Sequence, residues 1–336
     1  MFKFLTALWG ACLLACWLAL PASAQTDDVH LTPREAKTQR ADAGSDASGI
    51  ADPELRTHTK PVRKDVDLVL VPVTVTDPAT RLVSGLEKDS FVLLENGQPQ
   101  PIRSFSTEDA PISLGVIFDV SGSMADKIDQ ARQAVVEFFR SANPQDEFFL
   151  VTFSDQPQVL VNFTSSVDDI QKGLPYAVPH GATSLLDAIY LGVDRMRLAR
   201  NDRKALLIIS DGGDNHSRYT EDEVADMVRE ADVQIFAMAF VSRQAKTPEE
   251  LHGPELLGAI TLATGGETYF IHAPRELPEV ATKIGIELRN EYLLGYHPTN
   301  PAHDGKWRKI KVKLKPPTGL PPLHVYARAG YYAAGE

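Results

Sequence analysis

The sequence predicts an α/β protein in which a doubly wound, mostly parallel sheet is accompanied by a small flanking β module. Between residues 112 and 290, short apolar runs alternate with segments of helical period. Runs such as "SLGVIFD" are continuous rather than alternating, which is typical of parallel strands buried on both faces. The segments on either side are rich in valine and turn residues, which favours β structure. Together these observations predict a sheet covered by helices on both faces.

The middle region supplies the elements in order. After the strand at 113–119, Ile128, Ala131, Val135 and Phe138 fall on one face of a predicted helix. Further strands are predicted at 147–155, 158–164, 204–211, 233–241 and 267–271. Further helices are predicted at 184–198, 220–231, 255–266 and 275–290. The helix at 220–231 opens with a capping-box pattern, and the one at 255–266 ends in glycine.

The flanks predict one β module made from two separated parts of the chain. A strand is expected at 66–77, and two short strands are expected within 90–105 around the turn signal Asn96-Gly97. Three strand-like segments follow the last helix, at 291–298, 306–315 and 323–332. We therefore predict an N-terminal β segment at 66–109, an α/β domain at 110–289, and a C-terminal β segment at 290–336 that pairs with the first.

The N-terminus has the pattern of a secretory signal peptide. One lysine precedes an apolar run, and Ala22-Ser23-Ala24 predicts cleavage after residue 24. Two alternatives are a membrane anchor and a lipoprotein acylation site at Cys16. Both cysteines, Cys12 and Cys16, lie in this segment, so a mature chain without it has no disulfide. Residues 25–65 are polar and predict a disordered linker. The expected location is periplasmic or secreted, with no transmembrane span in the mature chain.

The charge is acidic and excludes one class of partner. The chain has 34 basic and 45 acidic residues, a formal net charge of −11, which becomes −12 when Lys3 is removed with residues 1–24. Nucleic-acid binding requires a basic surface, so nucleic acid is not expected as the main ligand.

Oxygen-bearing side chains occur in three segments: after the strand at 113–119, before the helix at 184–198 and at the end of the strand at 204–211. Ligands of open α/β sheets bind beyond the carboxyl ends of the strands. Five residues at such positions form the candidate metal site: Asp119, Ser121, Ser123, Thr183 and Asp211. Oxygen donors without cysteine or a histidine motif suit Mg²⁺, Mn²⁺ or Ca²⁺ rather than zinc. The alternative for the first three residues is that a serine only caps a helix.

These motifs resemble the von Willebrand factor type A (VWA) domain and its metal-ion-dependent adhesion site. The resemblance rests on D-x-S-x-S at 119–123, then "GATSL" and "SDGGDN" in order behind it. The flanks "VPVTVTD", "GLEKDSFVLLENG" and "RNEYLLGYHP" resemble the bacterial secreted "VWFA-related" family. One departure is His180 before Gly181, where a pair of glycines is common in the family.

The resemblance implies a VWA/Rossmann-like fold and a binding function. It implies that Ser121, Ser123 and Thr183 offer hydroxyl oxygens to the ion, while Asp119 and Asp211 act through bound water. Three neutral hydroxyls leave a divalent ion under-neutralised, so an open position favours an external carboxylate. At about 4 Å and an effective dielectric near 20, that attraction is roughly 8 kcal/mol before desolvation. The expected partner is therefore a protein that presents an Asp or Glu side chain.

Other functions are weighed against this adhesion hypothesis. A metal-dependent phosphohydrolase would use a second acid two residues after the aspartate, where this chain has Ser121. A serine hydrolase would need a G-x-S-x-G elbow, which is absent from this stretch. We therefore expect no catalysis. A structural envelope scaffold with a vacant metal site remains an alternative.

A row of lysines marks one further segment. Lys309, Lys311, Lys313 and Lys315 alternate with apolar residues. Either they protect an edge strand from aggregation, or they make a weak contact with an anionic surface.

Overall fold

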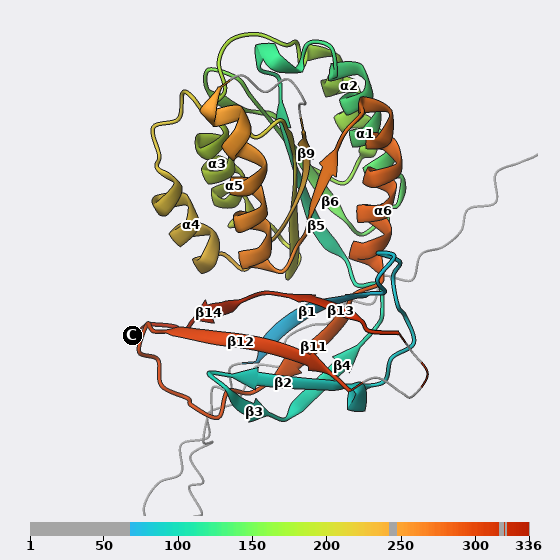
Figure 1. The fold of residues 1–336 in the computed structure, drawn as a ribbon, viewed down its shortest axis with the longest axis vertical. Helices are drawn as coiled ribbons and strands as arrows, with labels where there is room; N and C mark the ends of the chain where they lie inside the picture. Colours follow the sequence, from blue (N-terminus) through green and yellow to red (C-terminus); the bar gives the residue numbers. More distant parts are fainter. Residues whose placement is uncertain (1–67, 242–246, 316–318, 320, 336) are drawn as a thin grey trace, which may run out of the picture. The chain divides into compact units, whose positions relative to one another are not determined.

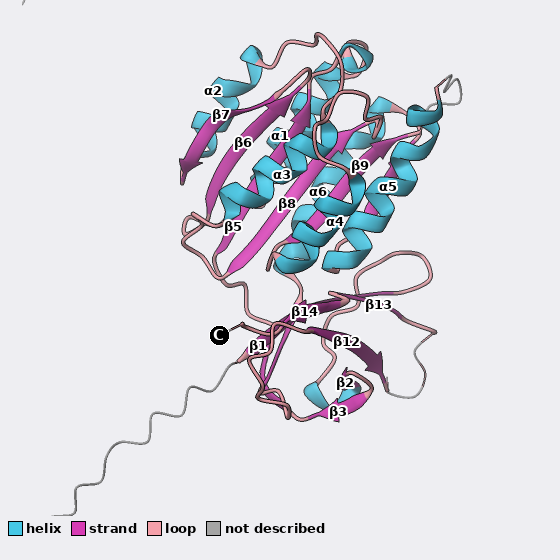
Figure 2. Cartoon of the chain, turned by 90° about the vertical axis from the view of Figure 1, so that its left-hand side faces the viewer, coloured by secondary structure: helices cyan, strands magenta, loops and turns pink. Residues whose placement is uncertain are grey.

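The structure is a computed structural model that describes residues 68–241, 247–315, 319 and 321–335. Within these residues, helices cover both faces of a six-stranded sheet, and the flanking segments form two smaller sheets (Figures 1 and 2). This arrangement confirms the predicted α/β fold class with its flanking β module. The predicted signal peptide and the predicted linker at 25–65 lie outside the described residues.

The central sheet has the strand order β10-β9-β8-β5-β6-β7. Its neighbouring strands are parallel except for the antiparallel pair β6 and β7. All residues of β5 and β6 are buried, which explains the continuous apolar runs in the sequence. The bounds are β5 Ile112–Asp119, β6 Glu147–Phe153, β7 Pro157–Thr164, β8 Arg203–Ser210, β9 Gln234–Phe240 and β10 Thr268–Ile271.

In the described part of the chain, three helices pack on each face of this sheet. One core contains buried residues of α1, α2 and α6, and a second core contains buried residues of α3, α4 and α5. These two groups lie on opposite sides of the sheet in Figure 1. The bounds are α1 Ile128–Arg140, α2 Val167–Gly173, α3 Leu185–Met196, α4 Glu221–Glu230, α5 Pro248–Thr264 and α6 Leu277–Arg289. Short 3₁₀ turns are η1 Lys88–Ser90, η2 Gly122–Met124, η3 Leu174–Tyr176 and η4 Pro274–Glu276.

Several local predictions for these helices are confirmed. The apolar face predicted for α1 is buried. Thr220 and Glu223 form the predicted capping box of α4. Helix α5 ends at Gly265, whose φ is +84°, but it begins earlier than predicted. Its first turn forms because the Thr247 hydroxyl accepts the backbone N–H of Glu250 at 3.2 Å.

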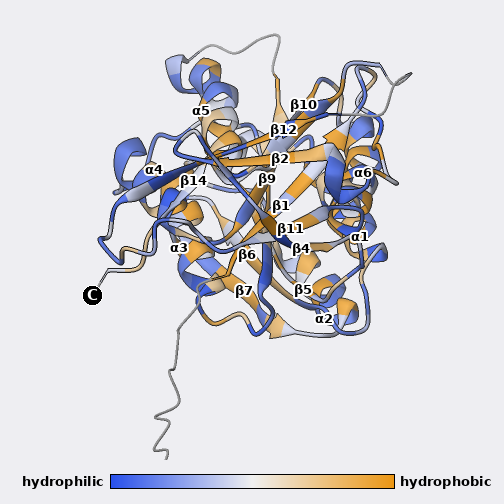
Figure 3. Cartoon of the chain, turned by 90° about the horizontal axis from the view of Figure 1, so that it is seen from below, coloured by the Kyte–Doolittle hydropathy of each residue, from blue (hydrophilic) through white to orange (hydrophobic). Residues whose placement is uncertain are grey.

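The β module consists of two four-stranded sheets, β13-β1-β11-β4 and β14-β12-β2-β3. The bounds are β1 Val69–Thr76, β2 Phe91–Glu95, β3 Gln98–Gln100, β4 Ile102–Ser106, β11 Tyr292–Tyr296, β12 Trp307–Leu314, β13 His324–Ala327 and β14 Gly330–Tyr332. Each sheet joins strands that precede the central sheet to strands that follow α6, through β1 with β11 and β2 with β12. Figure 3 shows β2 in the colours of apolar residues, and its buried residues Phe91 and Leu93 belong to the core between the sheets.

Two details of this module differ from the prediction. The stretch 90–105 forms three strands rather than two, because Pro101 separates β3 from β4, which pairs in the other sheet. The edge-strand prediction for β12 is correct for only part of the strand: β12 lies between β14 and β2 in the strand order, but β14 pairs with Trp307–Lys309 and β2 pairs with Ile310–Leu314, so the part that carries Lys311 and Lys313 is paired along one edge. Lys309, Lys311 and Lys313 are exposed on its outer face. Their alternation identified the solvent face correctly but carried no information about strand pairing.

Among the described residues, no helix is both long enough and apolar enough to cross a membrane.

Candidate metal centre

Asp119 ends β5 and lies at the base of the candidate site. Its side chain is fully buried. One carboxylate oxygen accepts the backbone N–H of Ser121 at 2.8 Å, and the other accepts the hydroxyl of Ser210 at 2.6 Å. Burial, followed by the nearby charge of Asp211, raises the pKa of Asp119 to about 7. Two carboxylates so placed disfavour each other's charge, and a bound cation would relieve that cost.

Ser121 and Ser123 lie just beyond the strand on the turn η2. Their hydroxyl oxygens are 3.0 Å apart. Ser121 is buried, whereas Ser123 is exposed. Ser121 occupies the N-cap position of η2, but its side chain makes no capping hydrogen bond, and α1 begins after Lys127. The helix-cap alternative therefore does not account for these two hydroxyls.

The loop that carries Thr183 is attached to the turn that carries the two serines. The backbone N–H of His180 donates to Val120 at 2.8 Å, and the N–H of Gly122 donates to the carbonyl of Gly181 at 3.1 Å. The N–H of Thr183 donates to the side chain of Asn215 at 3.0 Å. The Thr183 hydroxyl has no hydrogen bond in the described part of the chain, so it is available to a ligand.

The departure at His180 has a structural explanation. The two ring nitrogens lie 3.0 Å from the hydroxyl of Ser154 and 2.8 Å from the carbonyl of Val178. The next residue, Gly181, has φ of +71°, and a Cβ there would lie 2.4 Å from the carboxylate of Asp155. The glycine that this loop requires is therefore Gly181, and the His180 ring holds the loop against β6.

Asp211 directly follows β8, the strand next to β5 in the sheet. Its side chain is 13% exposed, and its carboxylate lies 3.8 Å from the ammonium of Lys127. Two residues of the same loop fix its surroundings. Asp214 accepts hydrogen bonds from the backbone N–H of Leu186 at the start of α3 and from the hydroxyl of Ser217, and Asn215 accepts the N–H of Thr183. Thus the carboxyl ends of two adjacent strands bring together two hydroxyls and two carboxylates, with Thr183 on the attached loop.

The donor set fits a hard divalent cation. Within the described residues, no group of three or more His, Cys, Asp or Glu side chains is placed to hold a metal. The candidate set depends instead on two carboxylates and three hydroxyls, all oxygen donors of the kind that Mg²⁺, Mn²⁺ and Ca²⁺ accept. A bound divalent ion would compensate the negative charge of the buried Asp119 carboxylate.

Sequence reasoning missed three contributors to this site. Ser210 hydrogen-bonds to Asp119, Lys127 approaches Asp211, and Gly253 of α5 lies against the backbone of Gly212. The signal for Lys127 was its place four residues after Ser123, which allows its side chain to fold back over the turn. Sequence alone gave no signal for Gly253, because the contact joins segments 41 residues apart.

We expect Gly253→Ala to lower the free energy of unfolding by about 1–3 kcal/mol and to weaken metal binding. A Cβ at Gly253 would lie 2.2 Å from the backbone carbonyl carbon of Gly212, next to Asp211. The collision must move α5 or the Asp211 loop, because neither contacting group is a flexible side chain. Urea denaturation and magnesium titration measure the two effects.

The matched control is Gly258→Ala on the same helix. A Cβ at Gly258 meets nothing within 4 Å, so this change is expected to stabilise by about 0.5–1 kcal/mol through helix propensity. Equal effects of the two substitutions would contradict a close backbone contact at Gly253.

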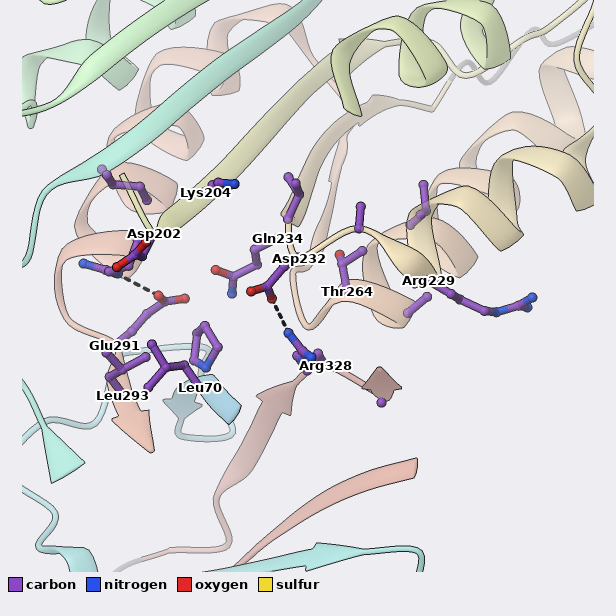
Figure 4. A pocket seen from close by; sticks show the side chains of 18 of the residues that line it. Leu70, Asp202, Lys204, Arg229, Asp232, Gln234, Thr264, Glu291, Leu293 and Arg328 are labelled. Atoms are coloured by element: carbon purple, nitrogen blue, oxygen red, sulfur yellow. Dashed lines mark hydrogen bonds and ion pairs between the residues drawn. The ribbon is translucent and has the colours of Figure 1, made fainter. Parts of the chain in front are cut away.

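A cavity of about 360 Å³ lies at the opposite ends of β8 and β9, against the β module (Figure 4). Four of its charged side chains form two pairs. Arg203 at the start of β8 lies 2.9 Å from Glu291, and Arg328 pairs with Asp232. These pairs join the central domain to the β module. We therefore interpret this cavity as part of the contact between the two, not as a second ligand-binding site.

Fold and site together define an α/β domain with oxygen donors at the carboxyl edge of its sheet. Comparison with known proteins identifies the family of this domain. Residues 114–213 match the family model of the von Willebrand factor type A domain. The chain therefore contains a von Willebrand factor type A domain, as the sequence motifs suggested.

Two curated relatives align with part of the chain. The inter alpha-trypsin inhibitor heavy chain 4 of Mus musculus is 30% identical over 148 residues, which are 39% of this chain and 16% of that protein. The corresponding Sus scrofa protein is 24% identical over 132 residues, 36% of this chain and 14% of that protein. The chain thus corresponds to a small part of either relative.

Solved structures also resemble this chain. The von Willebrand factor type A protein from Catenulispora acidiphila has a TM-score of 0.46 at 12% identity, covering 80% of this chain and 75% of its own.

Proposed function

We propose that this chain is an exported, divalent-cation-dependent protein-binding module. The observation that carries the proposal is the convergence of the Ser121 and Ser123 hydroxyls with the carboxylates of Asp119 and Asp211 at one edge of the sheet. The match of residues 114–213 to the von Willebrand factor type A domain, a kind of domain that mediates protein–protein interaction, supports a binding role.

In this proposal the ion is held by Ser121, Ser123 and Thr183, with Asp119 and Asp211 contributing through water. When bound, the ion supplies a Lewis-acidic position that accepts a carboxylate from a partner protein. The residues of the chain orient that position. Asp119 fixes the turn by accepting the N–H of Ser121, and Ser210 holds Asp119 in place. The export part of the proposal rests on the N-terminal sequence pattern.

The first test is stabilisation by magnesium. A ligand present at about 100 times its dissociation constant stabilises the folded state by about 2.7 kcal/mol, so the melting temperature is expected to rise by several degrees. Asp119→Ala and Ser121→Ala should abolish the rise. Asp129→Ala, an exposed acid of α1, is the control and should retain it.

A second test addresses the partner. Wild-type protein on a resin should retain an envelope protein in Mg²⁺ and release it in EDTA, while the Asp119→Ala variant retains none. Magnesium stabilisation without any Mg²⁺-dependent capture would favour a metal-stabilised scaffold over an adhesion module.

A further inference from the structure

The ammonium of Lys127 lies beside the candidate metal centre and is held in place there. It donates a 2.6 Å hydrogen bond to the backbone carbonyl of Ser123 and lies 3.8 Å from the carboxylate of Asp211. It also lies 5.5 Å from the centre of the Phe240 ring, at the end of β9. Three different segments of the chain therefore surround this one positive charge.

The burial of Lys127 distinguishes it from an ordinary surface lysine. Its side chain is 19% exposed, and its partner Asp211 is 13% exposed. A charge pair this shielded from water is screened less by salt than a surface pair. The other acid near Lys127, Asp126 at 3.6 Å, is 80% exposed and so contributes little. The main electrostatic partner of Lys127 is thus a residue of the metal centre.

The charges of the site determine what this lysine does. Asp119 and Asp211 contribute two negative charges when ionised, and Lys127 contributes one positive charge. A divalent ion added to this set leaves an excess of one positive charge, whereas the same set without the lysine would be neutral. The ammonium of Lys127 therefore weakens the attraction of the two carboxylates for the ion, and the excess positive charge of the loaded site attracts an anion to the open position of the ion.

We propose that Lys127 is a specificity-determining residue that weakens the binding of the divalent cation and strengthens the binding of a carboxylate to the loaded site. The inference rests on the proposed function and deepens it. Because of Lys127, the site binds the metal more weakly, and the metal-loaded site binds an acidic partner more strongly. A lysine with a merely structural role would, on replacement, weaken both steps together.

The test measures the two steps separately. Isothermal titration with Mg²⁺ gives the metal affinity, and repetition in sodium acetate shows how much a carboxylate strengthens it. In Lys127→Met, which keeps an unbranched side chain over Phe240, the dissociation constant for Mg²⁺ is expected to fall roughly three- to tenfold. The strengthening by acetate is expected to shrink by a similar factor.

Two further variants complete the experiment. Lys127→Arg keeps the charge and should behave as the wild type in both steps. Lys204→Met is the matched control, because Lys204 lies near the start of β8, at the far end of the strand that leads to Asp211. Melting in EDTA provides a readout without metal. Lys127→Met should melt below Lys204→Met, because Asp211 then has no counter-charge.

The outcomes separate this inference from the proposed function. If the wild type binds Mg²⁺ but Lys127→Met binds it equally or more weakly, the role of Lys127 is wrong while the metal site stands. An unchanged response to acetate in Lys127→Met would overturn the carboxylate half of the inference. If the wild type binds no Mg²⁺, the proposed function fails and this inference fails with it.

Discussion

Asp146→Ala is expected to lower the free energy of unfolding by about 3–5 kcal/mol, one of the two largest changes we predict. Asp146 is fully buried just before β6. Its carboxylate accepts the backbone N–H of Ile112 at 2.9 Å and that of Asn143 at 2.7 Å, and it pairs with Arg289 at the end of α6. Alanine would leave two N–H groups and a largely buried guanidinium without this acceptor.

The matched control for this prediction is Asp109→Ala. Asp109 also pairs with Arg289, at 3.1 Å, but its side chain is 40% exposed. Its removal is expected to cost less than about 1 kcal/mol. Urea denaturation of both variants gives the comparison. A loss below about 1 kcal/mol for Asp146→Ala would show that the acceptors Arg289 already has, the carbonyl of Ser141 and the carboxylate of Asp109, suffice for its guanidinium.

The fold class could be predicted because its signals are local. The run at Ile112–Asp119 is continuous and apolar, and a strand buried on both faces requires that composition. The capping pair Thr220 and Glu223 likewise lies within one turn of helix. The pairing of β12 with β2 could not be predicted, since it joins residues more than 200 positions apart and depends on packing in the β module.

The candidate site divides in the same way. Asp119, Ser121 and Ser123 could be identified from their spacing, and Asp211 could be added because the carboxyl ends of neighbouring parallel strands meet at one edge. The structure places these residues together, and their metal binding stays a prediction. Ser210 could not be assigned, because whether its hydroxyl reaches Asp119 depends on the register of β8 against β5.

The junction of the two β segments with the central domain contains a cluster of buried acids that sequence analysis did not identify. Glu287 of α6 is fully buried. The hydroxyl of Tyr269 in β10 donates to Glu287 at 2.5 Å and lies 3.2 Å from Glu267. Lys283 lies 3.8 Å from Glu287 on the same helix. Burial raises the pKa of Glu287 to about 7, and the charge of Glu267 adds to the shift.

We expect Glu287→Gln to remove a pH-dependent loss of stability. Below pH 4.5, Glu287 is protonated in both the folded and the unfolded chain, so its ionisation costs nothing. Between about pH 4.5 and 7 only the unfolded chain loses this proton, and the free energy of unfolding of the wild type falls. Above about pH 7 the full cost is present, about 3 kcal/mol for a shift of this size. Glutamine stays neutral throughout, so the free energy of unfolding of the variant should increase relative to that of the wild type as the pH rises.

Urea denaturation at pH 5, 6, 7 and 8 measures this difference. At pH 5 the variant should lie within about 1 kcal/mol of the wild type, and at pH 8 it should be more stable by about 2–3 kcal/mol. Burial also raises the pKa of Glu267 and of Glu291, so both proteins retain a slope of the same sign, and only the difference between them reports Glu287. The control is Glu279→Gln, which removes an exposed carboxyl from the same helix. If the difference in the free energy of unfolding between Glu287→Gln and the wild type does not change with pH, Lys283 keeps Glu287 ionised in the folded chain.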